Sequence, residues 1–180
     1  GSTVLYPSDP NQAAQLIQQM TELEGISYIR TTREKLPVIY PASESFRVGG
    51  SKTIKSSTSD KVAIIAAGIT VHEALTAYEL LQKEGISIRI IDAYSVKPID
   101  KQTIQQAVKD CGKLITVEDH WPEGGLGDAV LEALAGKEPI SATVVKLAPR
   151  SMPGSATPAE LLDAAGINAS AIIKAVKALV

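Results

Sequence analysis

Two short stretches of this 180-residue sequence carry groups that could transfer protons or bind an anion. Glu118-Asp119-His120-Trp121 follows a predicted strand, and a Glu/Asp/His cluster could do acid–base work. The turn Gly124-Gly125-Leu126-Gly127 precedes a predicted helix, so its backbone N–H groups could face an anion. We favour a plainer interpretation of each stretch. The acidic stretch would be a loop at a subunit contact, anchored by Trp121, and the glycine-rich stretch would be a tight turn into a packed helix. The turn matches neither the Gly-x-Gly-x-x-Gly fingerprint nor a Gly-Lys-Ser/Thr phosphate loop.

Arginine side chains form a third candidate site, at the end of an earlier predicted strand. Arg30 and Arg33 lie in the segment Tyr28–Glu34, and ligands usually bind at the carboxyl ends of strands in α/β sheets. The guanidinium group offers a rigid fork of donors that suits a phosphate or a carboxylate. Two arginines after a strand are more often solvated charges or members of ion pairs, so the residues alone leave both interpretations open.

The remaining reactive side chains give weaker signals. Thr70 to Glu73 fit a helix capping box, which would place His72 in a first helical turn at a surface or an interface. Cys111 follows a predicted helix end, and we interpret it as a small core residue rather than a nucleophile. One cysteine excludes an internal disulfide framework, and one cysteine with two separated histidines argues against structural zinc. We therefore expect no catalytic residue and no metal ligand in this chain.

The composition excludes several classes of protein. The formal net charge is -2 with 21% charged residues, which is not the balance of a basic nucleic-acid binder or of a disordered acidic tail. Only 4% of the residues are aromatic, which argues against a stacking surface for single-stranded nucleic acid. The apolar run Val62–Ala67 is too short to span a bilayer, and residues 1–3 lack the features of a signal peptide. We expect a soluble cytoplasmic protein, or a piece of one, with no membrane partner.

Strands and helices alternate from residue 61 to the end of the chain. Val62–Ala67 is a continuous apolar run, as expected for a strand that is covered on both faces. Further strands are predicted at Ile86–Ile91, Lys113–Val117 and Ala142–Leu147. Helices are predicted to start near Thr70, Asp100, Gly124, Thr157 and Asn168. The alternation predicts an α/β fold, a three-layer α/β/α sandwich with a mostly parallel sheet.

The first sixty residues read as two further parts. Residues 1–42 are predicted to form one βαβ unit, in which Asp9 caps the helix and Pro10 occupies its first position. A lone βαβ unit cannot cover both faces of its strands, so we expect a remnant of a second, larger domain. Residues 43–60 are rich in Gly and Ser and are predicted to be a linker, with a short strand within 46–55 as an alternative.

Several motifs together resemble the transketolase family of thiamine-diphosphate enzymes. Val4–Asp9 and Tyr28–Arg33 look like the strands that enter and leave the last βαβ unit of the family's pyrimidine-binding domain. Three later motifs resemble the family's C-terminal domain: Ala67–Leu75, Thr116–Val130 and Thr157–Leu162. The wider family includes deoxyxylulose-phosphate synthase and the β subunits of 2-oxo-acid dehydrogenases, but the first two motifs favour transketolase itself.

The resemblance implies a fold, a reaction and one substrate contact. It implies that residues 1–42 are a remnant of the pyrimidine-binding domain and that residues 61–180 are the C-terminal domain. The family moves a two-carbon ketol unit from a ketose phosphate to an aldose phosphate, using thiamine diphosphate anchored by Mg²⁺. In transketolases the arginine in the place of Arg33 contacts the sugar phosphate. Another group stays a candidate anion or interface loop: Glu118, Asp119, His120, Gly124 and Gly125.

The family's cofactor-binding motif is missing from the sequence. That motif begins Gly-Asp-Gly, whereas the only Gly-Asp pair here, Gly127-Asp128, is followed by Ala129. We therefore expect the C-terminal portion of a homodimeric transketolase, which binds no cofactor and is inactive without its missing N-terminal cofactor domains. Two alternatives remain: a small subunit of a split transketolase-like or 2-oxo-acid dehydrogenase enzyme, and a stand-alone module that binds an anion at the Gly124–Gly127 turn.

Overall fold

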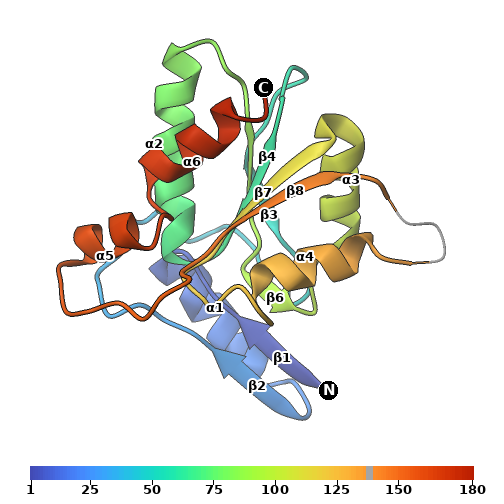
Figure 1. Cartoon of the computed structure of the whole chain (residues 1–180). Coiled ribbons are helices and arrows are strands. Elements are labelled where there is room, and N and C mark those ends of the chain that lie inside the picture. The colour runs from blue at the N-terminus through green and yellow to red at the C-terminus, as the bar shows by residue number, and fades with distance from the viewer. Residues whose placement is uncertain (137–139) are drawn as a thin grey trace.

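A five-stranded sheet organises most of the molecule, for which the computed structural model describes residues 1–136 and 140–180 (Figure 1). The strand order is β3-β5-β4-β7-β8, and all neighbours are parallel except β3, which runs antiparallel to β5. The strands are β3 (Lys52–Lys55), β4 (Ala63–Ala66), β5 (Arg89–Asp92), β7 (Lys113–Val117) and β8 (Thr143–Leu147). Every residue of β4 is buried, as its unbroken apolar run predicts for a central strand.

Helices cover both faces of this sheet, which confirms the predicted three-layer α/β/α architecture. One face packs against α2 (Ile69–Lys83) and α6 (Ala169–Lys177), and the other packs against α3 (Lys101–Cys111) and α4 (Leu126–Leu134) (Figure 1). Alternate residues of β4 divide between the two cores: Ile64 joins the α2/α6 side and Ile65 joins the α3/α4 side. No helix within the described ranges is long and apolar enough to cross a bilayer.

The N-terminal segment, residues 1–42, is attached to this sandwich through a second sheet. Its three strands have the order β2-β1-β6, where β1 (Ser2–Leu5) and β2 (Ile26–Ile29) are parallel and β6 (Ser95–Lys97) is antiparallel to β1. The helix between β1 and β2 is α1 (Pro10–Met20), and Asp9 caps it by accepting the N–H of Gln12, as predicted. The sequence carries no signal for β6, because three residues that closely follow a buried strand have no periodic pattern of their own.

Residues 43–60, predicted to be a linker, contain a short strand and a buried aromatic side chain. Lys52–Lys55 is the edge strand β3, and Phe46 is only 6% exposed. The Phe46 ring makes edge-to-face contacts with Tyr40 and Tyr94, at centroid distances of 4.9 and 5.5 Å. The segment is therefore packed between the N-terminal helix and the main sheet, because its one aromatic side chain has two aromatic neighbours.

The predicted capping box at Thr70–Glu73 is wrong. Helix α2 begins after Gly68, which has a left-handed φ of 59°, and no side chain caps it. The buried hydroxyl of Thr70 lies 2.8 Å from the Val117 carbonyl and so ties the start of α2 to β7. The Glu73 carboxylate instead accepts the N–H of Ala169 at the start of α6, at 2.7 Å.

Helix α5 (Pro158–Ala164) has the capping box that its sequence predicts. Thr157 accepts the N–H of Glu160, and the Glu160 carboxylate accepts the N–H of Thr157 at 2.9 Å. Replacing Thr157 with alanine should lower the free energy of unfolding by about 1 kcal/mol, since the helix end loses one acceptor. Urea denaturation would measure this change, and Thr157→Ser, which keeps the hydroxyl, should stay close to the parent protein. An equal loss for both variants would contradict the capping role.

Candidate functional site

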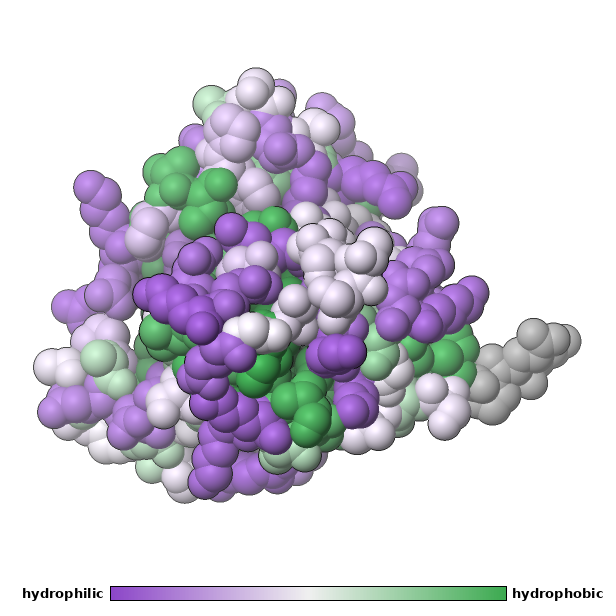
Figure 2. Space-filling model, turned by 90° about the horizontal axis from the view of Figure 1, so that it is seen from above, coloured by the Kyte–Doolittle hydropathy of each residue, from purple (hydrophilic) through white to green (hydrophobic). Residues whose placement is uncertain are grey.

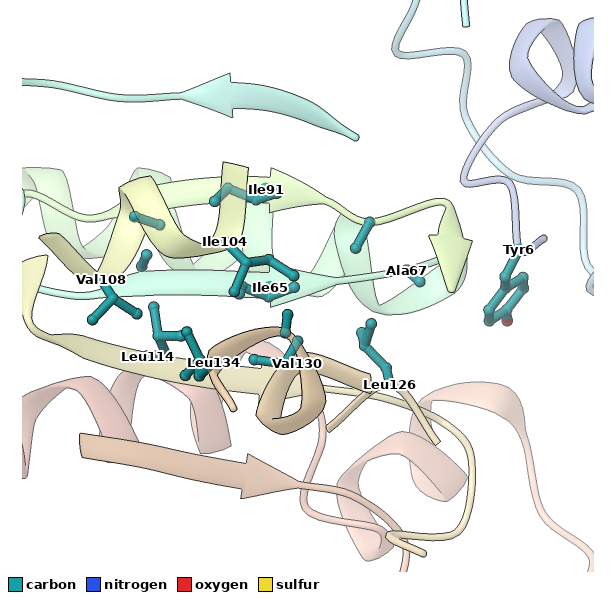
Figure 3. Packing of buried hydrophobic residues seen from close by; sticks show 14 residues of the cluster. Tyr6, Ile65, Ala67, Ile91, Ile104, Val108, Leu114, Leu126, Val130 and Leu134 are labelled. Carbon is teal, nitrogen blue, oxygen red and sulfur yellow. The ribbon is translucent and has the colours of Figure 1, made fainter. Parts of the chain in front are cut away.

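The carboxyl ends of β4 and β7 lie side by side at the centre of the sheet. From there the chain enters α2 on one face and α4 on the other, and such a switch point is where open α/β sheets usually bind ligands. Here the buried ring of Tyr6 fills the position, since a Cβ on Gly68 would lie 2.0 Å from a Tyr6 ring carbon. Figure 3 shows Tyr6 at the end of the hydrophobic cluster, beyond Ala67 and Leu126. The N-terminal segment therefore fills part of this crevice, and a cavity of about 650 Å³ remains there, lined by Tyr6, Ala67 and Leu126 among others.

The glycine-rich turn binds a carboxylate of its own chain. The N–H of Leu126 donates to Oε2 of Glu118 at 2.6 Å, and the N–H of Gly127 donates to Oε1 at 2.9 Å. Glu118 is only 4% exposed, and burial raises the pKa of its carboxyl while these amide bonds oppose the shift. The first amides of α4 are thus paired with Glu118, which argues against an external anion at the turn.

The close approach of this carboxylate explains the glycine at position 125, because a Cβ there would lie 1.9 Å from Oε2 of Glu118. A Cβ on Gly127 would first meet Cε of Lys146, at 2.3 Å, and would lie 3.0 Å from Oε1 of Glu118. Asp128 closes the turn from outside, because it accepts the N–H of Gly124 at 2.6 Å and pairs with Lys146 at 2.7 Å.

The three consecutive side chains of the acidic loop face different partners. Glu118 faces α4, whereas Asp119 pairs with Arg30 at 2.8 Å. His120 is exposed, and its Nδ1 lies 2.7 Å from the Trp121 carbonyl. Trp121 is itself 45% exposed. In residues 1–136 and 140–180 no hydrogen bond joins these three side chains to one another, but all three line one cavity of about 650 Å³ together with Gly124 and Gly125.

Arg33 lies at the wall of a cavity of about 450 Å³ between the N-terminal segment and α5. Arg30, Tyr6 and Asp119 line the same cavity, while Leu161 and other apolar residues line the opposite wall. The Arg33 side chain is exposed, and in the described part of the chain it makes no ion pair. The structure thus brings Arg30 and Arg33 to one cavity but gives only Arg30 a protein partner.

A buried polar cluster joins the N-terminal segment to β5, and sequence analysis missed it. Oδ2 of Asp92 accepts hydrogen bonds from Ser8 Oγ at 2.8 Å, Gln12 Nε2 at 2.9 Å and the Tyr40 hydroxyl at 2.8 Å. Asp92 is fully buried, and burial raises the pKa of its carboxyl to about 6, even though these three bonds favour the ionised form. The one signal in the sequence is an aspartate directly after the predicted strand Ile86–Ile91, at the edge where the strands end.

The weaker candidates have structural contacts. His72 Nε2 lies 2.7 Å from the Ser8 carbonyl, at the contact between α2 and the N-terminal segment. Cys111 is half-buried, and burial raises the pKa of its thiol, which does not favour a nucleophile. In residues 1–136 and 140–180, no three His, Cys, Asp or Glu side chains lie close enough to hold a metal ion.

The face of the molecule drawn in Figure 2 is not broadly apolar. Hydrophobic residues show there as separate areas among hydrophilic ones. The most exposed of the large apolar side chains lie far apart in the sequence. Among them are Met152 at 89%, Ile26 at 73% and Val38 at 61% exposure.

Comparison with known proteins gives a consistent result. Residues 51–172 match the family described as "Transketolase, C-terminal domain". The chain is 48% identical to mouse "Transketolase-like protein 2" over 176 residues, which is 97% of this chain and 28% of that protein. It is 43% identical to human "Transketolase" over 180 residues, which is 99% of this chain and 29% of that protein. The chain therefore spans less than a third of the length of these relatives.

Solved structures agree with this result. A structure titled "Split gene transketolase, inactive beta4 tetramer" superposes with a TM-score of 0.91 at 34% identity, covering 99% of this chain and 57% of that one. The transketolase of Campylobacter jejuni shares the fold, with a TM-score of 0.73 at 14% identity over 98% of this chain and 26% of that one. On the match over residues 51–172, the chain belongs to the transketolase C-terminal domain family.

Proposed function

We propose that this chain supplies the C-terminal domain and one substrate contact to a transketolase assembly. The observation that carries the proposal is the 43% identity to a transketolase over 99% of the chain. In this proposal the assembly transfers a two-carbon ketol unit between sugar phosphates in the cytoplasm, and thiamine diphosphate supplies the carbanion chemistry. Other domains hold that cofactor and its Mg²⁺ in this proposal, because the chain lacks the Gly-Asp-Gly motif with which the family's cofactor site begins. Residues 1–42 belong to the pyrimidine-binding domain, with 43–60 joining it to residues 61–180.

The proposal is tested by separating the chain from the cofactor domains. The chain alone, with thiamine diphosphate, Mg²⁺, a ketose phosphate and an aldose phosphate, should form no product. Adding the cofactor-binding domains should restore turnover in a stoichiometric complex. We propose that this complex contains two copies of the chain, as a homodimer. The structural relative titled as an inactive tetramer is consistent with the first result. Ketol transfer by the chain alone, or an assembly that is equally active without it, would refute the proposal.

Arg33 is the proposed contact for the substrate phosphate. It lies at a cavity wall beside Arg30, and a guanidinium–phosphate pair forms charge-assisted hydrogen bonds. Replacing Arg33 with alanine in the active assembly should raise KM for the sugar phosphates about 10- to 100-fold, since a hydrogen bond to a charged group contributes about 1.5–3 kcal/mol. Steady-state kinetics would measure this, with a ketose that lacks a phosphate as the control substrate. An equal loss with both substrates would show that Arg33 acts on folding or chemistry rather than on the phosphate.

A further inference from the structure

Arg30 and Asp119 form a clamp between two strand ends that are 89 residues apart. Nη2 of Arg30 donates to the Asp119 carboxylate at 2.8 Å, and both Nη atoms lie 3.3 Å from the Asp119 carbonyl. The same carboxylate oxygen accepts the Tyr6 hydroxyl at 3.0 Å, and the Arg30 guanidinium lies 4.8 Å from the centre of the Tyr6 ring. One acidic residue at the end of β7 thus fixes both the head group of Arg30 and the residue that fills the switch point.

The clamp is shielded enough to hold a single geometry. The side chains of Arg30 and Asp119 are 34% and 20% exposed. The guanidinium is held by a carboxylate, a carbonyl and an aromatic face at once, so several contacts fix its orientation. Ion pairs with fixed, multiple contacts of this kind contribute more than mobile surface pairs do.

The clamp lies at the start of the segment that carries Arg33. The N–H of Arg30 donates to the Leu5 carbonyl at 2.9 Å, and residues 31–39 then form no helix or strand. The segment is fastened again where the N–H groups of Ile39 and Tyr40 donate to the Asp9 carboxylate at 3.0 and 2.9 Å. Arg33 therefore lies between two anchors, and the nearer one is the contact of Arg30 with Asp119.

We propose that Asp119 is a positioning residue, which acts through Arg30 to hold the Arg33 segment in the conformation that binds the substrate phosphate. This inference rests on the proposed role of Arg33 as the phosphate contact. Asp119 and Arg33 line one cavity, so their effects on an anion there can be compared directly. Asp119 does not need to touch the substrate for this role.

A purely electrostatic role and a positioning role of Asp119 predict opposite changes in phosphate affinity when its carboxylate is removed. A carboxylate near an anion site repels the anion, so removing its charge by Asp119→Asn would strengthen phosphate binding if Coulomb interactions alone decided. Releasing Arg30 from its partner would act in the same direction. A positioning role predicts weaker binding, because the Arg33 segment would then populate many conformations and only a fraction of them would bind. The sign of the change therefore separates the two roles.

The test is a titration of the full 180-residue chain with inorganic phosphate, followed by NMR through the arginine Nε–Hε signals. Arg33→Ala, followed through the Arg30 signal because Arg30 lines the same cavity, should abolish the saturable shift, and Asp119→Asn should raise the dissociation constant about 5- to 10-fold. Arg30→Lys, which keeps the charge but loses the fork of donors, should also weaken binding. The matched control is Asp128→Asn, which removes the carboxylate of another ion pair, that with Lys146, and should leave the constant unchanged within about twofold.

A second readout, which does not depend on phosphate, is amide hydrogen exchange. Asp119→Asn should speed exchange at residues 31–34 about tenfold while leaving the strands β4 and β7 protected. This comparison also shows whether the variant is folded.

Each other outcome overturns a defined part of the proposal. If Arg33→Ala loses binding while Asp119→Asn binds as tightly as or more tightly than the parent, the positioning role is wrong and the role of Arg33 stands. If exchange at residues 31–34 is the same in both proteins, the positioning role is also wrong. If the parent chain shows no saturable shift at Arg33, both the phosphate contact and the inference built on it are wrong.

Discussion

Replacing Asp92 with alanine is expected to lower the free energy of unfolding by about 4 kcal/mol, measured by urea denaturation at pH 5. The substitution removes the single oxygen that accepts hydrogen bonds from Ser8, Gln12 and Tyr40. All three donors lie in the N-terminal segment and stay buried, so they cannot turn to water without opening its contact with β5. A loss below about 1 kcal/mol would show that the three donors find other acceptors.

The same carboxyl should make stability depend on pH. Burial raises the pKa of Asp92 to about 6 from its ordinary value of 3.8, so the folded state holds the proton more tightly than the unfolded state does. This contribution to stability is complete below pH 3.8 and is lost as the pH rises through about 6, by about 3 kcal/mol in total. The neutral isostere Asp92→Asn isolates the effect, because Glu118 and other groups titrate in both proteins. The stability of the parent relative to Asp92→Asn should therefore fall between pH 4 and pH 7. A difference in stability between the two proteins that stays constant with pH would contradict this prediction.

Replacing Gly125 with alanine should destabilise the chain by about 3 kcal/mol. Its φ of -97° is accessible to any residue, so the backbone itself gives no strain. The cost arises because the new Cβ would lie 1.9 Å from Oε2 of Glu118 and would drive this carboxylate from the two amides at the start of α4. Thermal or urea unfolding would measure the change.

The neighbouring glycine and a double variant serve as controls. Gly124 has a φ of 72°, and a Cβ added there would meet no atom within 4 Å, so Gly124→Ala should cost only about 1–2 kcal/mol of backbone strain. In the background of Glu118→Ala, Gly125→Ala should cost much less, because the nearest atom is gone and only the exposed His120 side chain, 2.8 Å from the new Cβ, has to move. Additive effects in this double-mutant cycle would contradict the coupling between Gly125 and Glu118.

Local signals predicted the elements well because their partners are close in sequence. Asp9, Asp100, Thr157 and Asn168 each accept the N–H of a residue three positions later, and all four were predicted as helix starts. The α/β architecture followed from the alternation of apolar strands with amphipathic helices. The capping box at Thr70 failed because α2 begins at Ile69, which places Thr70 inside the first turn, where its hydroxyl donates to the Val117 carbonyl.

The arrangement of the candidate site could not be read from the sequence, because its contacts join distant residues. The acidic loop was recognised, but the sequence does not show that Glu118 turns toward α4 while Asp119 pairs with Arg30. Asp92 was missed altogether, since its donors are 52 to 84 residues away. The resemblance to transketolases pointed to Arg33, and the role of that residue stays a prediction until its affinity for phosphate is measured.

The third strand of the small sheet also sets an order of events during synthesis. Strand β1 and helix α1 leave the ribosome early, but β6 and Asp92 follow long after them, with 84 residues between Ser8 and Asp92. Closing a loop of that length costs about 4 kcal/mol of chain entropy, so the early segment has little to gain by ordering alone. In the nascent chain α1 therefore cannot make its contacts with Asp92 and Tyr94 until β6 has emerged, so this part of the fold is completed only late in the synthesis of the segment.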